Sequence, residues 1–190
     1  MIISLLNKLI EALGSGFKQY TKNIALGLIP NLSDKMQILR EDCQSCLDKW
    51  VEFIGFDTVI IYFPPFLKTD NIDIRTEILC FIRKYKEKFN KILGETVFKD
   101  MVSPLLYCLQ DRSSSVRLLA EDILKFSLSF INMRNYESKF KDFKPAIQKD
   151  LKLILNRIQN ESNITEDDSQ VNNNTINKEN GYIEKMILLD

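Results

Sequence analysis

A pattern that occurs three times constrains the fold of this chain more than any other feature. An apolar residue followed by arginine opens each copy, at Leu39-Arg40, Ile74-Arg75 and Val116-Arg117. The arginines are spaced by 75 − 40 = 35 and 117 − 75 = 42 residues. A turn with an aspartate precedes each pair, and an apolar segment with proline precedes each turn. A period of roughly 35 to 47 residues with two helices per unit is typical of a HEAT-repeat α-solenoid.

The residues that follow each apolar-arginine pair have the spacing of one buried helix face. The first two copies place apolar residues at +4, +7, +8, +11 and +15 from Leu39 and Ile74. They are Cys43, Cys46, Leu47, Trp50 and Ile54 in one copy, and Ile78, Phe81, Ile82, Tyr85 and Phe89 in the other. The third copy continues with Ala120, Ile123, Leu124 and Ile131. The pattern predicts second helices over 39–54, 74–89 and 116–131, with Trp50 in the core.

The segments around these helices complete the predicted solenoid. Residues 2–13 form an amphipathic helix that Gly14 ends. First helices are expected over 17–32, 58–67 and from Val102 to the third turn, with a kink at Pro64-Pro65. A last helix begins near Pro145, a residue type that the first helical turn permits. We therefore predict an all-α HEAT-repeat solenoid over residues 1–160, made of about four helix pairs.

The composition changes after residue 160. Residues 161–190 hold seven acidic and two basic residues, a net charge of −5, so residues 1–160 carry +5. This stretch is rich in asparagine, and we predict that residues 161–190 form a disordered acidic tail. A small apolar cluster over 183–189 is either a docking element or a frayed helix. The basic body fits an acidic partner or an ordinary solvated surface, and the sequence leaves both open.

The sequence argues against catalysis. It has no histidine, which removes Ser-His-Asp and Cys-His nucleophiles and HExxH metal sites. Phosphate-binding glycine loops are also absent from it. Cys43-Gln-Ser-Cys46 is a lone CxxC, so helix packing is favoured over a zinc or redox role. No signal peptide or membrane span is predicted. We expect no enzyme activity, cofactor, metal, nucleic-acid partner or membrane partner.

The third copy carries a resemblance to a known family. Residues 105–117, LLYCLQDRSSSVR, with Ala120–Phe126 after them, resemble the fifth HEAT repeat of TOG domains. Phe143-Lys-Pro145 before the last helix resembles the same region, and residues 71–79 and 39–50 look like the two preceding repeats. TOG domains occur in the microtubule-polymerase family and its CLASP relatives. The chain is most similar to later TOG domains of the polymerase family, over about Leu5 to Ile158.

The resemblance implies a function and a site. TOG domains bind the αβ-tubulin dimer, without catalysis, through the turns inside each helix pair, in microtubule plus-end dynamics or spindle organisation. Such a protein would act in the cytoplasm on the cytoskeleton, at microtubules, the spindle or the centrosome, with αβ-tubulin or microtubule ends and further TOG domains as partners. The tubulin-binding residues carried over are Lys35, Met36, Arg40, Asn71, Arg75, Arg112, Ser113 and Arg117. These turns together form one edge of the domain, which also includes Asp34, Gln37, Thr69, Asp70, Asp73 and Ser114.

Two alternatives stay open. Arg40, Arg75 and Arg117 could instead bond with aspartates between neighbouring units, as a structural ladder. The chain could also be a generic HEAT-repeat scaffold for a partner other than tubulin. The chain also departs from the pattern of the family, because a TOG domain has about six HEAT units and the first repeat here is missing or incomplete. We therefore expect an uncapped apolar helix face at residues 2–13, in either a segment of a multi-TOG protein or a degenerate copy.

Overall fold

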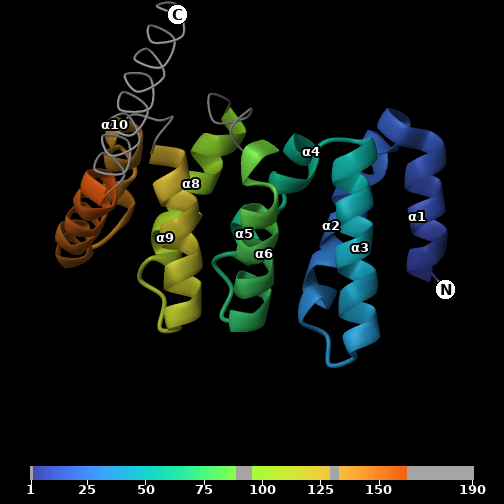
Figure 1. Ribbon diagram of the computed structural model, residues 1–190, viewed down its shortest axis with the longest axis horizontal. Coiled ribbons are helices and arrows are strands. Elements are labelled where there is room, and N and C mark those ends of the chain that lie inside the picture. The colour runs from blue at the N-terminus through green and yellow to red at the C-terminus, as the bar shows by residue number, and fades with distance from the viewer. Residues whose placement is uncertain (1, 89–95, 129–132, 162–190) are drawn as a thin grey trace, which may run out of the picture.

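The computed structural model describes residues 2–88, 96–128 and 133–161. Every regular element in these ranges is helical, and the helices stand side by side in a row (Figure 1). The predicted all-α HEAT-repeat solenoid is confirmed. The predicted tail lies outside the described residues, except for Glu161. No helix in these ranges combines the length and hydrophobicity needed to span a bilayer.

The chain begins with a single helix and continues as helix pairs. Helix α1 (Ile2–Leu13) ends at Gly14, whose φ of 48° is left-handed, as a helix end at glycine requires. The first pair consists of η1 (Gly14–Tyr20), α2 (Thr21–Leu28), η2 (Ile29–Ser33) and α3 (Gln37–Phe53). The second consists of α4 (Phe56–Ile60), α5 (Phe63–Phe66) and α6 (Ile72–Lys84).

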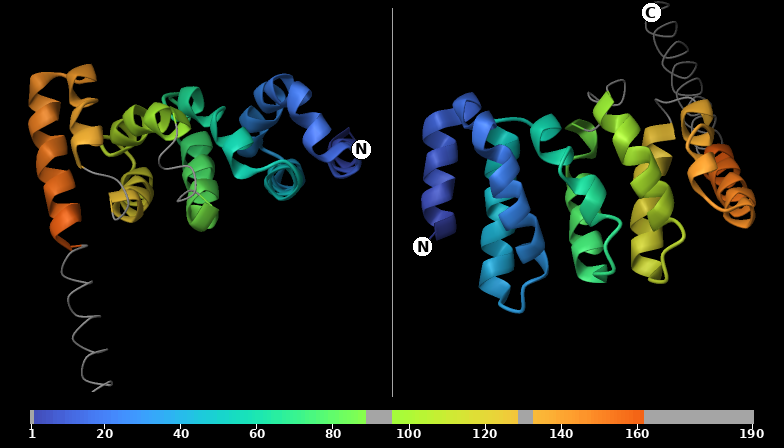
Figure 2. Two further views of the ribbon diagram at one scale, coloured as in Figure 1. Left: turned by 90° about the horizontal axis from the view of Figure 1, so that it is seen from above. Right: turned by 180° about the vertical axis from the view of Figure 1, so that it is seen from behind.

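The third pair consists of α8 (Thr96–Cys108) and α9 (Ser114–Leu128). It is followed by α10 (Met133–Glu137), η3 (Phe140–Asp142) and a last helix over 145–161. Seen from above, α3, α6 and α9 lie in one layer, and α2, α4 and α8 lie in the other (Figure 2). The solenoid core fills the space between these layers.

The second helices match the predicted stripes. Their buried residues include Cys43, Cys46, Leu47, Trp50 and Ile54 in α3 and at its end, and Ile78, Phe81 and Ile82 in α6. Trp50 is fully buried, as predicted, with its ring edge-on to Phe17 at a centroid distance of 6.3 Å. Its Nε1 donates a hydrogen bond to Thr58 Oγ1 at 2.9 Å. Each second helix begins two residues before the predicted start, at Gln37, Ile72 and Ser114.

The first helices differ from the prediction. The segment 17–32 is not one α-helix, because 3₁₀ segments flank the eight residues of α2. The segment 58–67 is divided into α4 and α5, so the kink predicted at Pro64-Pro65 is confirmed, although it breaks the helix rather than bending it. Pro64 lacks an N–H, and its ring would clash with the carbonyl of Ile60, the residue at which α4 ends. Helix α6 ends at Lys84, earlier than predicted. The predicted stripe residues Phe89 and Ile131 lie outside the described residues.

Polar contacts between successive second helices hold the solenoid in register. Gln44 on α3 donates to Glu77 on α6 at 2.6 Å, and Asp48 on α3 accepts from both Lys84 and Tyr85 at 2.7 Å. The last helix is tied to α9 by ion pairs of Arg157 with Glu121 and of Lys125 with Glu161, at 2.8 and 3.2 Å. Lys49 on α3 pairs with Glu11 on α1. Each contact joins a second helix to the next helix in the row.

Candidate partner-binding edge

The turns inside the helix pairs lie along one edge of the solenoid, at the bottom of Figure 1. The first turn joins η2 to α3, the second joins α5 to α6, and the third joins α8 to α9. An Asx side chain shapes each turn. Asp34 Oδ1 accepts from Met36 N at 2.8 Å, Asn71 Oδ1 from Ile74 N at 3.1 Å, and Asp111 Oδ1 from Ser113 N at 2.8 Å. These bonds satisfy backbone donors where each second helix begins.

The arginine of each repeat folds back onto its own turn. Arg40 Nη1 donates to the carbonyl oxygens of Asp34 at 2.7 Å and Lys35 at 3.3 Å. Arg117 Nη1 donates to the carbonyl oxygens of Asp111 at 2.7 Å and Arg112 at 3.0 Å. We call this contact, to the carbonyl six residues earlier, the arginine clamp.

Arg75 forms the same clamp, with Nη1 donating to the carbonyl of Thr69. The three clamps satisfy turn carbonyls that the helices cannot, and they fix the shape of each turn. Three of the residues predicted to bind tubulin therefore have a clear structural role.

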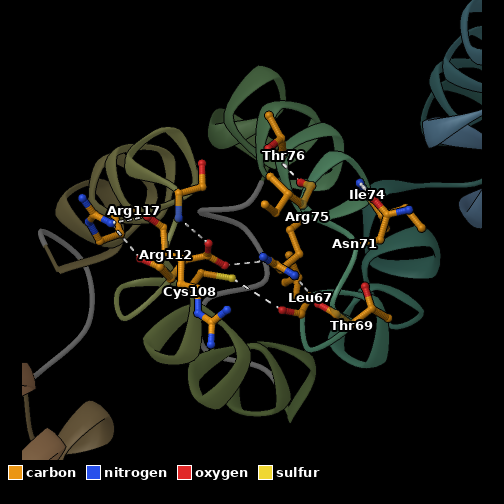
Figure 3. A network of polar contacts seen from close by, with 12 residues as sticks. Leu67, Thr69, Asn71, Ile74, Arg75, Thr76, Cys108, Arg112 and Arg117 are labelled. Carbon is orange, nitrogen blue, oxygen red and sulfur yellow. Dashed lines mark hydrogen bonds and ion pairs between the residues drawn. The ribbon is translucent and has the colours of Figure 1, made fainter.

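Arg75 also joins the second turn to the third. Its Nε lies 2.7 Å from Asp111 Oδ2, and the two side chains are only 8% and 3% exposed. Figure 3 shows Arg75 reaching from α6 toward the third turn. The Nε–H does not point at the oxygen, so the contact is an ion pair rather than a directed hydrogen bond. The predicted ladder between units is thus present at Arg75, whereas the clamps of Arg40 and Arg117 stay within their own turns.

Asn71 joins the second turn to the first. Its Nδ2 donates to Ser33 Oγ at 3.1 Å, while its Oδ1 caps α6. Together with the Arg75–Asp111 ion pair, this bond connects the three turns in series. The edge is therefore set in shape before any partner arrives, which reduces the entropic cost of binding.

Two predicted site residues remain available as charges on the edge. The side chains of Lys35 and Arg112 are exposed, and within the described parts of the chain neither has a polar partner. Met36 is 64% exposed, and Ser113 is half-buried. Between the two positive turns, Asp70 and Asp73 of the second turn are also exposed. The edge therefore alternates in charge along its length.

The sequence reasoning missed apolar side chains on this edge. Ile38 is 69% exposed, and Ile72 is 46% exposed. Both lie just before a buried stripe but off its spacing, which is the signal that could have found them. Ile72 also lines a groove of about 460 Å³ between the second and third turns, together with Tyr107, Arg112 and Phe143. The edge can thus offer a partner both charged and apolar contacts.

Cys43 and Cys46, the lone CxxC, are fully buried. Burial raises the pKa of the Cys43 thiol to about 11 and that of Cys46 to about 12; nearby Asp42 adds to the first shift, and Cys43 adds to the second. Both residues are thus protonated packing residues at neutral pH. Within the described ranges, no group of three or more histidine, cysteine or acidic side chains is placed to hold a metal.

We expect thiol reagents to report this burial. At pH 8, Ellman's reagent should label half-buried Cys80 first and reach Cys43, Cys46 and Cys108 only on unfolding. A Cys80→Ser variant should lose the fast phase of labelling, and a fast phase that persists in this variant would contradict the assignment.

Folding raises the pKa values of the Cys43 and Cys46 thiols, so their contribution to the free energy of unfolding is complete below about pH 9. This contribution should decline as the pH rises toward 11 and 12.

Comparisons with known proteins agree on the fold. The crystal structure of the MAST/Orbit N-terminal domain matches 83% of this chain and 70% of its own, with a TM-score of 0.54 and 20% identity. Centrosomal protein 224 of Dictyostelium discoideum is 22% identical over 157 residues, or 82% of this chain. The chain spans about 8% of that relative's length. No family model matches the chain.

Proposed function

We propose that this chain is a non-catalytic module that binds αβ-tubulin through the turn edge, in microtubule plus-end dynamics or spindle organisation. The observation that carries the proposal is the edge itself, in which three linked turns present Lys35, Met36 and Arg112 to solvent. The name of one similar protein, centrosomal protein 224, supports a cytoskeletal setting. We place the module nearest the later TOG domains of the polymerase family on the resembling residues alone.

We divide the predicted site residues into candidates for direct contact and residues that position the turns. Lys35, Met36 and Arg112 are candidates for direct contact because their side chains are exposed, and half-buried Ser113 is a candidate because it follows Arg112 in the third turn. Arg75 is only 7% exposed and is bonded on both sides. We assign it the role of positioning the turns.

Arg40 and Arg117 hold their turns through the arginine clamp. Asn71 links two turns, and its exposed position allows a contact as well. The acidic surface of tubulin would then meet cations that need no rearrangement before binding.

Charge reversal tests the proposal. Lys35→Glu with Arg112→Glu should weaken tubulin binding at least about tenfold, because two charge-assisted contacts are lost and two repulsions are added. The matched control is Lys18→Glu with Lys22→Glu, which changes the net charge equally at exposed positions of η1 and α2, near the opposite edge. Gel filtration with purified αβ-tubulin at low and moderate salt, together with thermal unfolding, measures binding and integrity.

Equal loss in the two double variants would mean that net charge, not the edge, governs the interaction. Retained binding in the edge variant would reject the turn edge as the site.

A second candidate function is a HEAT-repeat scaffold for a partner other than tubulin. The exposed apolar side chains of Met36, Ile38 and Ile72 favour it, because they offer contacts that need no acidic partner. Wild-type chain that fails to co-elute with tubulin at any salt concentration would support this second function.

A further inference from the structure

The first helix of the solenoid has an apolar face that no other part of the described chain covers. Its inner side packs on α3, with Ile10 fully buried. Its outer side carries Ile2, Leu5, Leu9 and Leu13, which are 82%, 60%, 42% and 48% exposed. Exposed leucine and isoleucine at helical spacing form a contiguous patch of the kind that marks a binding surface.

This face opens into a groove between α1 and the first helix pair. The groove has a volume of about 490 Å³. Its walls are almost wholly apolar and include Ile3, Leu6, Ile24, Leu28, Leu39 and Cys43. Asn23 and Asn31 supply the polar side chains of the lining. A groove of this shape and character suits the apolar face of one short helix.

The chain itself contains a segment of matching character. Residues 182–189, YIEKMILL, follow a polar stretch rich in asparagine and lie outside the described residues. Ile183, Met186 and Ile187 have the spacing i, i+3, i+4, and Tyr182, Met186 and Leu189 have the spacing i, i+4, i+7. These are the anchor positions of a helix that binds in a groove.

The connecting residues are long enough for the segment to reach the groove. Helix 145–161 and α1 stand at opposite ends of the solenoid, with α9, α6 and α3 between them (Figure 1). Four helix-to-helix steps of about 8–10 Å each amount to roughly 32–40 Å. Residues 162–181 span up to about 66–72 Å when extended, at about 3.3–3.6 Å per residue. Binding within one chain therefore leaves ample slack.

We propose that residues 182–189 bind as a short helix in the groove between α1 and α2 and thereby cover this end of the solenoid. The C-terminal segment would then cover the exposed end of the solenoid of its own chain. Because the linker keeps the segment near the groove, modest intrinsic affinity suffices for occupancy.

Photo-crosslinking in the full chain tests the contact directly. A benzophenone amino acid replaces Ile187, and mass spectrometry locates the crosslinked residues after light scattering has established the oligomeric state. We expect crosslinks to α1 and α2, within a monomer. Leu5→Glu, at an exposed groove position, should reduce them several-fold, whereas Leu118→Glu on α9, at a residue 66% exposed, should leave them unchanged.

Dye binding supplies an independent measurement. Met186→Asp with Ile187→Asp should raise the fluorescence of an apolar dye several-fold by opening the groove, while Val171→Asp with Ile176→Asp in the same tail should not. Crosslinks spread over the solenoid, or no response of the dye to either pair, would overturn the proposal. A dimer that Leu5→Glu dissociates and that the Met186/Ile187 variant preserves would also overturn it, since a second copy would then cover the groove.

Discussion

Arg75→Ala should lower the free energy of unfolding by about 3–5 kcal/mol, the cost of leaving one buried partner of an ion pair without its opposite charge. The guanidinium and the Asp111 carboxylate are 8% and 3% exposed, so water cannot replace the missing partner. The same substitution removes the clamp on the Thr69 carbonyl and the link between the second and third turns. Both losses act on a segment that packs directly against α9.

Urea unfolding of four chains, the wild type, Arg75→Ala, Asp111→Ala and the double variant, gives the coupling between the two residues. We expect the double variant to be less destabilised than the sum of the single variants. Arg40→Ala is the matched control, because Arg40 forms the same clamp without a buried ion pair. It should cost only about 1–2 kcal/mol. Equal losses at positions 40 and 75 would show that the clamp, not the ion pair, accounts for the effect.

Trp50→Ala should cost about 3–5 kcal/mol as well, the usual range for emptying a large aromatic site in a core. The indole is fully buried between Phe17 and Tyr62, at centroid distances of 6.3 and 6.1 Å. It joins three elements, because Phe17 belongs to η1 and Tyr62 lies between α4 and α5. The cavity would therefore loosen the first two helix pairs together.

Trp50 is the only tryptophan of the chain, so far-UV circular dichroism must follow unfolding of this variant. Trp50→Phe should recover more than half of the loss, because most of the ring packing remains. Thr58→Val removes the 2.9 Å hydrogen bond from the indole together with the 2.7 Å bond that Thr58 Oγ1 donates to the Gly55 carbonyl, and it should cost about 1–2 kcal/mol. A Thr58→Val loss as large as that of Trp50→Ala would contradict the view that packing dominates.

Periodicity was sufficient to predict the second helices. Cys43, Leu47 and Trp50 follow the 3.6-residue spacing and are buried as expected, because α3 exposes one face and buries the other. The predicted starts of the second helices are two residues too late. The apolar spacing marks only the buried stripe, whereas an Asx residue in the turn determines where the helix begins.

Other features could not be predicted from one sequence. The kink at Pro64-Pro65 was predicted, but the 3₁₀ segments on either side of α2 were not, because the apolar residues of this first helix carry no clear period. The pairing of Arg75 with Asp111 joins residues 36 positions apart (111 − 75), and many aspartates could have served. The exposure of Ile38 and Ile72, by contrast, could have been predicted, because both residues lie off the spacing of the buried stripe.

The contacts between second helices determine how the molecule would bear a mechanical load. Gln44–Glu77, Asp48–Lys84, Glu121–Arg157 and Lys125–Glu161 each join partners only 33 to 36 residues apart. Force applied at the two ends would therefore pass from helix to helix in series. Such a chain would extend in steps, one helix pair at a time, and each released pair could refold on its still-folded neighbour. A module of this kind can yield under tension without losing its whole structure.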